Sequence, residues 1–562
     1  MGAVVSRVVG VVKAAKAIVG ALRDLHQQFS AVLARAATPP GLPVPNPTRA
    51  FWQDDPPFPE LVDIRSPALP DTADVVIIGS GITGAAVARS VLHLSRQPPG
   101  TPLPRRVVVL EARQLCSGAT GRNGGHIKAS PHELLAQYRK SGLSTTRAAA
   151  LVRFQLRALP VLTGLCEAEG FEGAECREVE TVDLFASRKA FAEAVEGMDE
   201  VRRWLPEVTT DVWSAEEARE VSFLPAAGCY WGGGLRDGAD AETKRFDAND
   251  FVVGALSYTA GALWPYRFVT AVWRKLLDEF PDVLSIETGT PVEAVQVDGT
   301  DDDHPYRLQT PRGVVRARHV VHATNGFTSH LVPKLRSKMV GLLATMSAQR
   351  PGSLFPDLGG RRSWSFLFTD GFDYITQRPP RDGVPGELMV GGGYFQAEGK
   401  GLENIGVYDD SKLEALACSH LEGVMPTLFA PKWGDDGAGG RTKALWSGVI
   451  ALSADGLPFV GRLDTRITGR KARASLPGKG AAAKEAASGE WIAAAFIGDG
   501  MVWSWLCGTA LGAMIVGRDK EDLTAEPGRP GGKVEDWLPK ELLPTYERIQ
   551  RIDLADLAEG YL

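Results

Sequence analysis

The sequence predicts an α/β protein, α+β overall, in which a nucleotide-binding domain is interleaved with a second domain. Three observations lead to this fold class. The chain has 562 residues, 44% of them hydrophobic, which is enough for more than one core. From Asp71 onward, apolar runs typical of strands alternate with helical patterns. One such run leads directly into a glycine-rich turn and a helix, which is the local pattern of a Rossmann-like unit.

Charge and cysteine usage exclude several classes of partner. The formal net charge is −6, from 62 basic and 68 acidic residues, so we expect no long-range attraction for nucleic acid and no nucleic-acid partner. The six cysteines are scattered, with no CxxC pair and no grouping with histidine, which predicts no metal site. The N-terminus lacks the cleavage pattern of a signal peptide, which favours an intracellular protein.

Residues 1–38 predict an amphipathic helix. Apolar side chains from Val4 to Leu33 recur at spacings of four and three, and basic residues lie off this stripe. These charges prevent the segment from crossing a bilayer. Three interpretations stay open: a helix docked on its own protein, a peripheral membrane anchor, and a mitochondrial presequence. Gly2 and Ser6 match a myristoylation pattern, which favours a cytoplasmic protein in contact with a membrane surface.

Three further segments are expected to lie outside the packed domains. Residues 39–70 begin with a proline-rich run, which predicts an extended linker between the N-terminal helix and the body. Residues 466–489 are rich in Arg, Lys, Ala and Gly without an apolar period, which predicts a disordered surface loop. We expect residues 526–562 to form a C-terminal tail.

The most specific motif begins with the apolar run of residues 74–78. A glycine turn and a helix follow, and we expect these residues to bind a dinucleotide: Gly79, Ser80, Gly81, Ile82, Thr83 and Gly84. Glycine lets the backbone approach a pyrophosphate, and the helix N-terminus offers N–H groups to its oxygens. The next strand, residues 107–110, ends in Glu111 and Ala112, where the carboxylate can accept from ribose hydroxyls.

The segment after this acid resembles a second fingerprint, that of the D-amino-acid oxidase and sarcosine oxidase superfamily of FAD-dependent oxidoreductases. Residues 118–125 read GATGRNGG and are most similar to the γ-glutamylputrescine oxidase-like branch. The resemblance implies that the cofactor is FAD. It also implies which residues of this loop lie beside the isoalloxazine or the pyrophosphate: Thr120, Arg122, Asn123, Gly124 and Gly125.

The resemblance extends over about residues 71–525 and implies a domain organisation. A Rossmann-like FAD-binding domain of glutathione-reductase type would comprise residues 71–182, 261–334 and 447–525. A substrate domain built on a mixed sheet would comprise residues 183–260 and 335–446. Further blocks similar to the family assign more residues to the cofactor: Val292, Thr324, Gly326, Gly498, Asp499, Gly500 and Met501.

The activity that the resemblance implies is FAD-dependent oxidation of a C–N bond in an amine or amino acid. Hydride transfer to flavin would be followed by imine hydrolysis, with oxygen as acceptor and release of H2O2. The alternatives are a dehydrogenase that passes electrons to a quinone or carrier protein, and a non-catalytic flavin-binding scaffold. The family's substrate sheet indicates Tyr374 and Trp446 as catalytic-site residues. Residues 445–448, where sarcosine oxidases carry a flavin-linking cysteine, contain none, so we expect noncovalent FAD.

Overall fold

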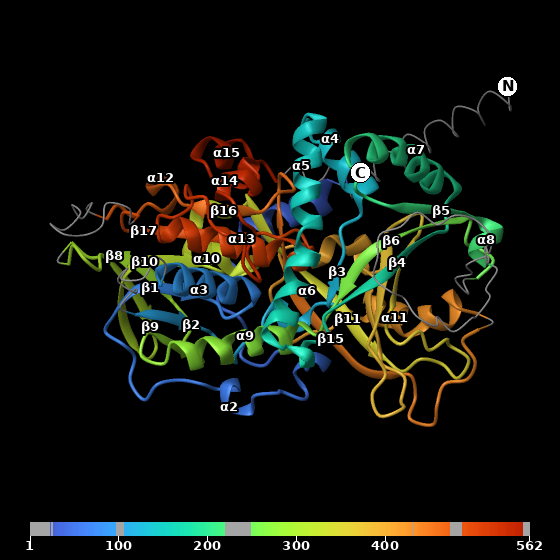
Figure 1. Cartoon of the computed structure of the whole chain (residues 1–562), viewed down its shortest axis with the longest axis horizontal. Helices are drawn as coiled ribbons and strands as arrows, with labels where there is room; N and C mark the ends of the chain where they lie inside the picture. Colours follow the sequence, from blue (N-terminus) through green and yellow to red (C-terminus); the bar gives the residue numbers. More distant parts are fainter. Residues whose placement is uncertain are drawn as a thin grey trace, which may run out of the picture.

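A computed structural model of the chain describes residues 23, 26–96, 106–219, 249–299, 301–430, 432–472 and 486–554. These residues form two β-sheets, one of eight strands and one of nine. The first lies to the left and the second to the right in Figure 1, with helices packed around and between them. The expected combination of a nucleotide-binding domain and a second sheet domain is therefore confirmed.

The first sheet has the parallel core expected of a Rossmann-like domain. β1 (Thr72–Ile78) pairs in parallel with β2 (Val107–Leu110) and with β10 (Gly313–His322). β7 and β17 extend this parallel set, and β16 and the β8–β9 hairpin are antiparallel additions. Their bounds are Leu284–Glu287 (β7), Ala294–Val297 (β8), Tyr306–Thr310 (β9), Phe459–Arg462 (β16) and Gly489–Ala494 (β17).

The central strand β1 is covered on both faces. Val75 and Ile77 belong to the core cluster that holds the buried residues of α3 (Ile82–Ser95), α9 (Pro265–Glu279) and α13 (Gly500–Ile515). Val76 and Ile78 belong to a second cluster, together with residues of the β8–β9 hairpin. Because neither face meets solvent, the strand is apolar without alternation, as parallel strands usually are.

The second sheet is mixed. β4 and β12 pair in parallel, and all other described pairs of this sheet are antiparallel. Its strands are β3 (His126–Ile127), β4 (Arg177–Phe185), β5 (Thr210–Ser214), β6 (Gly254–Ala262), β11 (Met339–Gln349), β12 (Arg362–Leu367), β13 (Phe372–Gln377), β14 (Leu388–Gly392) and β15 (Thr442–Ser453). The sheet includes β3 and runs along β15 past residue 446, so it draws on chain outside the ranges expected for the substrate domain. The domain boundaries themselves remain a prediction.

The remaining helices surround these sheets. They are α2 (Pro59–Val62), α4 (Pro131–Lys140), α5 (Thr145–Leu156), α6 (Ala158–Glu169), α7 (Arg188–Trp204), α8 (Ala215–Arg219), α10 (Thr328–Leu331), α11 (Ala415–Leu428), α12 (Thr465–Thr468), α14 (Val534–Trp537) and α15 (Tyr546–Arg551). By length and composition alone, Thr145–Glu169 could cross a membrane, but 56% of its most apolar window is buried inside the protein. Its apolar residues are therefore accounted for by the core.

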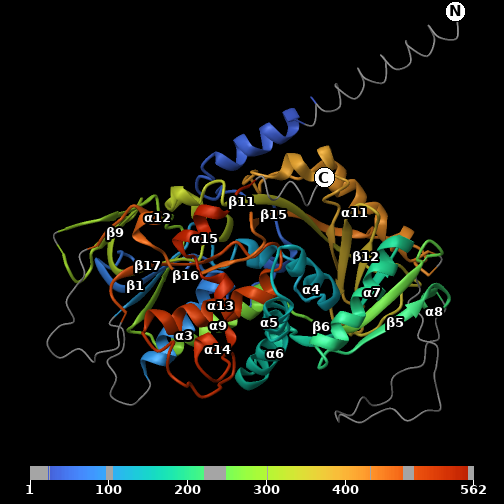
Figure 2. The same ribbon diagram turned by 90° about the horizontal axis from the view of Figure 1, so that it is seen from above.

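The described part of the N-terminal helix, residues 26–37, packs on the body of the protein. Val32 and Ala36 are buried in one core cluster with residues of β11. Arg35 donates hydrogen bonds to the carbonyl oxygens of Leu402 and Ile405. Figure 2 shows this helix, in blue, beside β11. The docked interpretation holds for these residues, whereas Gly2 and Ser6 lie outside the described residues, so the anchor and presequence interpretations remain predictions.

Three segments expected to lie outside the packed domains contact the body through their described residues. In residues 39–70, Trp52 and Leu61 are almost fully buried, because the apolar residues between the prolines find places in the core. In the segment 466–489, residues 473–485 lie outside the described residues, but Arg470 forms two hydrogen bonds with Glu490, at 2.8 and 2.6 Å. The described part of the C-terminal segment contains α14 and α15 and is also packed.

The contact between α3 and α13 generates a stability prediction. A Cβ atom at Gly512 would lie 2.4 Å from Ser90 Cβ and 3.0 Å from Val87 O, so the two helices touch through backbone. Gly512→Ala should therefore lower the free energy of unfolding by about 1–3 kcal/mol. Gly423→Ala in α11, where a Cβ meets nothing within 4 Å, is the matched control and should raise it by up to ~1 kcal/mol. Urea unfolding of both variants checks this, and equal midpoints would contradict it.

Candidate functional site

A long hollow opens at the carboxyl ends of β1, β2 and β10, which are neighbours in the first sheet. Ligands of open α/β sheets bind at this edge. We call it the cofactor hollow. Most of the residues expected to bind the cofactor line it: Gly79, Ser80, Gly81, Ile82, Thr83, Glu111, Ala112, Thr120, Asn123, Val292, Thr324, Gly326, Gly498, Gly500 and Met501. Residues far apart in the sequence therefore meet in one site, as the resemblance implied.

The turn between β1 and α3 is shaped by two close backbone contacts. Gly79 has φ +109°, and a Cβ there would lie 2.6 Å from Ala323 O. A Cβ at Gly84 would lie 2.1 Å from Gly79 O. Gly84 does not line the hollow but lets the first turn of α3 press onto the loop. Glycine is needed at both positions for steric reasons, and the turn keeps its backbone open toward the hollow.

The N-terminus of α3 faces the hollow without a cap from its own N-cap residue. Its N-cap residue Gly81 makes no capping hydrogen bond, and the N–H of Ile82 donates to Thr120 Oγ1 at 3.0 Å. Both ends of this contact line the hollow. An uncapped helix N-terminus presents N–H groups and the positive end of the helix dipole, which suits a phosphate group.

Glu111 is held in place by the turn. Its Oε2 accepts hydrogen bonds from Ser80 N at 3.0 Å and Ser80 Oγ at 2.7 Å, and its Oε1 accepts from Arg113 N at 3.0 Å. A carboxylate offers about four acceptor positions, so one stays open toward the hollow that the residue lines. That arrangement fits a ribose hydroxyl as the missing donor.

In the loop of residues 118–125, some residues line the hollow and others pack against the second sheet. Asn123 lines the hollow, its Oδ1 accepts from Gly125 N at 2.7 Å, and its Nδ2 lies 3.5 Å from Met501 Sδ. Gly124 and Gly125 do not line it. A Cβ at Gly124 would lie 2.3 Å from the ring of Tyr374, and one at Gly125 would lie 2.2 Å from Leu263 O. These glycines bring the loop against the second sheet.

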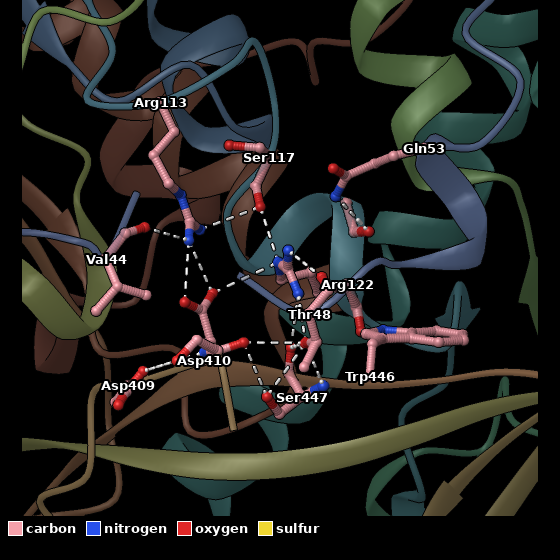
Figure 3. A network of polar contacts seen from close by, with 12 residues as sticks. Val44, Thr48, Gln53, Arg113, Ser117, Arg122, Asp409, Asp410, Trp446 and Ser447 are labelled. Carbon is pink, nitrogen blue, oxygen red and sulfur yellow. Dashed lines mark hydrogen bonds and ion pairs between the residues drawn. The ribbon is translucent and has the colours of Figure 1, made fainter. Parts of the chain in front are cut away.

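Arg122 is not a lining residue, contrary to expectation. It lies in a buried polar network shown in Figure 3. Its Nη1 donates to Ser447 O at 2.8 Å and its Nη2 to Thr48 O at 2.7 Å, and its Nε lies 3.5 Å from Asp410 Oδ2. Burial lowers the pKa of Arg122 to about 10, and Asp410 opposes that shift. The guanidinium thus joins the loop to Thr48, Asp410 and Ser447.

Asp499 stands immediately before α13, which begins at Gly500 on the wall of the hollow. The residue is exposed by surface area, yet protein surrounds its carboxyl on most sides. This burial raises the pKa of Asp499 to about 7, the negative charge of Glu133 raises it further, and Lys128 opposes both. Asp499 does not itself line the hollow. It is a carboxyl that can gain or lose a proton near neutral pH.

The two aromatic candidates differ in position. The hydroxyl of Tyr374 lies 3.0 Å from Met346 Sδ, and its ring stacks on His126 with centroids 6.2 Å apart. Burial and then the charge of Asp499 raise the pKa of Tyr374, so Tyr374 and Asp499 share one region beside the fingerprint loop. Trp446 is 0% exposed and donates from Nε1 to Arg122 O at 2.7 Å. Its indole is enclosed by protein and does not line the hollow, and its catalytic role remains a prediction.

Several lining residues were not expected from the sequence. Most adjoin expected ones, such as Arg113 after Ala112 and Asn325 after Thr324. A second group comes from the segment expected to be a linker: Gly41, Leu42 and Pro43. Nothing in a proline-rich run signals contact with a ligand, so sequence reasoning had no means of finding them.

These features fit FAD. The uncapped α3 N-terminus, the open acceptor position of Glu111 and the uncapped start of α13 lie along one hollow. They match a diphosphate, a ribose and an electron-accepting ring in turn. No cysteine is among the described residues that line the hollow, which agrees with noncovalent FAD. In the described part of the chain, no group of three or more His, Cys, Asp or Glu residues could hold a metal ion.

The glycine turn generates a prediction about the cofactor. A Cβ at Gly81 would lie 2.8 Å from Thr120 Oγ1, so Gly81→Val should block the approach of the pyrophosphate and yield protein without flavin. Flavin absorbance per polypeptide measures this. Gly164→Val in α6, where a Cβ meets nothing within 4 Å, is the control and should keep its flavin. Full flavin content in the Gly81 variant would show that the site is misplaced.

Two known proteins resemble the chain over most of its length. The chain is 25% identical over 490 residues to the bifunctional protein of tRNA 5-methylaminomethyl-2-thiouridine biosynthesis from Paracidovorax citrulli (strain AAC00-1). That match covers 83% of this chain and only 61% of the relative. The chain is also 24% identical over 407 residues to the γ-glutamylputrescine oxidoreductase of Escherichia coli (strain K12). This match covers 70% of this chain and 78% of the relative.

A solved structure and a family model complete the comparison. Glycine oxidase from Geobacillus kaustophilus aligns with a TM-score of 0.55 and 16% identity, covering 82% of this chain and 98% of that one, which shows a shared fold. The model of the family described as FAD dependent oxidoreductase matches residues 74–514. The predicted superfamily and cofactor are thereby confirmed: the chain belongs to this family of FAD-dependent oxidoreductases.

Proposed function

We propose that the protein oxidises a C–N bond of a small amine or amino acid, that the imine is then hydrolysed, and that oxygen receives the electrons and leaves as H2O2. Bound FAD supplies the hydride acceptor for this chemistry. The observation that carries the proposal is the cofactor hollow of an FAD-dependent oxidoreductase, with the carboxyl of Asp499 at the start of the helix on its wall.

A carboxyl at this position meets a chemical requirement of amine oxidation. An amine with an ordinary pKa near ~10 is a cation at neutral pH, and a cationic nitrogen does not release hydride readily. The ionised carboxylate of Asp499 can take the ammonium proton at its Oδ atoms. The half-buried ring of Tyr374, beside the loop of residues 118–125, would add apolar surface that disfavours a charged nitrogen. The names of two similar proteins, a γ-glutamylputrescine oxidoreductase and a glycine oxidase, support a nitrogen-containing substrate.

The electron acceptor is a second part of the proposal. Lys334 and Lys338 come shortly after the lining residue Leu331 in the sequence. Lys334 Nζ donates to Arg466 O at 2.6 Å, and Lys338 Nζ donates to Ile552 O at 2.5 Å. Both ammonium groups are bound by backbone carbonyl oxygens, so neither is assigned to oxygen activation. This observation keeps a dehydrogenase that uses a quinone or carrier protein as the second candidate function.

An anaerobic titration tests the function. The flavin spectrum of the purified protein is recorded while amines and amino acids are added one at a time, and we expect at least one to bleach it. Air is then admitted, and return of the oxidised spectrum with peroxide supports the oxidase. Return only after addition of a quinone supports the dehydrogenase. If no amine or amino acid bleaches a flavin that dithionite reduces normally, the proposal fails and a non-catalytic flavin scaffold becomes the better reading.

The role of Asp499 generates a pH prediction. Its carboxyl is protonated below pH about 7 and ionised above it, so kcat/KM should increase as the pH rises through that value. Asp499→Asn should remove this inflection and lower kcat/KM above pH 7 by about 100-fold. Glu133→Gln removes a charge that raises the pKa of Asp499, so its inflection should move to lower pH. An unchanged profile in the Asp499 variant would exclude the residue as the base.

A further inference from the structure

The segment of residues 38–50, which we call the strap, contributes to the cofactor hollow from outside the family's matched region. The family model begins at residue 74, whereas Gly41, Leu42 and Pro43 line the hollow together with the dinucleotide-binding turn. The strap is therefore an addition of this chain to a site that the family match otherwise accounts for.

Leu42 shows what this addition can do. It is 37% exposed, one of the few large apolar side chains in the described chain with so much free surface, and it lies on the wall of the hollow. Exposed apolar surface on a pocket wall is covered when a ligand fills the pocket, which favours the bound state. Pro43 next to it has a fixed φ, so little backbone freedom is lost on binding.

A buried latch holds the strap in place (Figure 3). Asp410 stands between two arginines: both of its oxygens accept from Arg113 Nη1 at 3.0 Å, and its Oδ2 lies 3.5 Å from Arg122 Nε. All three side chains are at most 7% exposed. Thr48 N donates to Asp410 O at 2.7 Å, and Arg113 Nη1 reaches Val44 O at 3.3 Å. The latch thus fixes the strap at two points.

The latch also shares a residue with the cofactor site. Arg113 lines the hollow, and its backbone N–H donates to Glu111, the carboxylate that fits the ribose. The strap therefore reaches the hollow at its Glu111 end. Both flanks of the strap are docked as well: Arg35 precedes it on the helix of residues 26–37, and Trp52 after it donates to Asn123 O at 2.5 Å.

We propose that the strap is a cofactor-retaining element that closes over the ribose end of bound FAD and sets the rate at which FAD leaves. Leu42 supplies the covering surface. Thr48 and the Asp410 latch keep that surface over the hollow. The inference rests on the FAD site but not on the identity of the substrate or of the electron acceptor.

Two strap variants and one control test this. Leu42→Ala removes the covering side chain, and Thr48→Val removes a hydroxyl that accepts from Ser447 N at 3.0 Å and Arg122 Nη1 at 3.2 Å. We expect each to speed FAD release about tenfold, measured on the holoenzyme as the rise in FAD fluorescence after dilution. Asn46→Ala changes an exposed strap residue that does not line the hollow and should release FAD as the wild type does.

Hydrogen exchange on the unmodified protein is the second measurement. Amides of residues 38–50 should exchange more slowly with FAD bound than in the apoprotein. Wild-type release rates in Leu42→Ala, with no change in exchange on FAD binding, would overturn the proposal. A lowered apoprotein melting temperature in Thr48→Val with unchanged FAD release would also overturn it, because the strap would then be only structural. Failure of the amine titration while these effects remain would reject the proposed reaction and leave the strap intact.

Discussion

The segments around the cofactor hollow are joined by one buried interaction, in which two arginines share a carboxylate. Asp410 lies with Arg113 and Arg122 where almost no solvent reaches. Removing one partner of such a buried group leaves uncompensated charge and typically costs ~3–5 kcal/mol. Because Arg113 follows the ribose-binding acid and Arg122 belongs to the fingerprint loop, this pairing ties two cofactor-binding loops to residue 410, in the chain that leads into α11. Thr48 and Ser447 add the strap and β15 to the same network.

The position of Arg122 changes how the fingerprint loop, residues 118–125, is interpreted. Its sequence suggests a cation that faces the cofactor, but the guanidinium points away and is enclosed by carbonyl oxygens. The polar side chains that the loop places on the wall of the hollow are those of Thr120 and Asn123. Both are hydrogen-bonded to backbone groups. The arginine therefore fixes the conformation of the loop from the side away from the hollow.

Prediction from sequence succeeded where local chemistry determines structure. The glycine turn, the acid at the end of β2 and the start of α13 line one hollow, as the motifs indicated, because a few neighbouring residues determine each of these features. The sequence did not indicate how Trp446 and Arg122 pack, because their positions depend on contacts with chain segments more than 300 residues away. The strap was missed for a related reason: prolines forbid helix and ladder hydrogen bonds, but they do not decide whether a segment packs.

The close contact between α3 and α13 at two glycines has a consequence for the shape of the cofactor site. Both helices begin at the hollow, and they touch through backbone at Gly508 and Gly512. Backbone contacts cannot adjust as side-chain rotamers do, so the spacing between the two helix N-termini is fixed when the protein folds. A ligand that contacts both helix N-termini must therefore match a distance that the fold sets before binding.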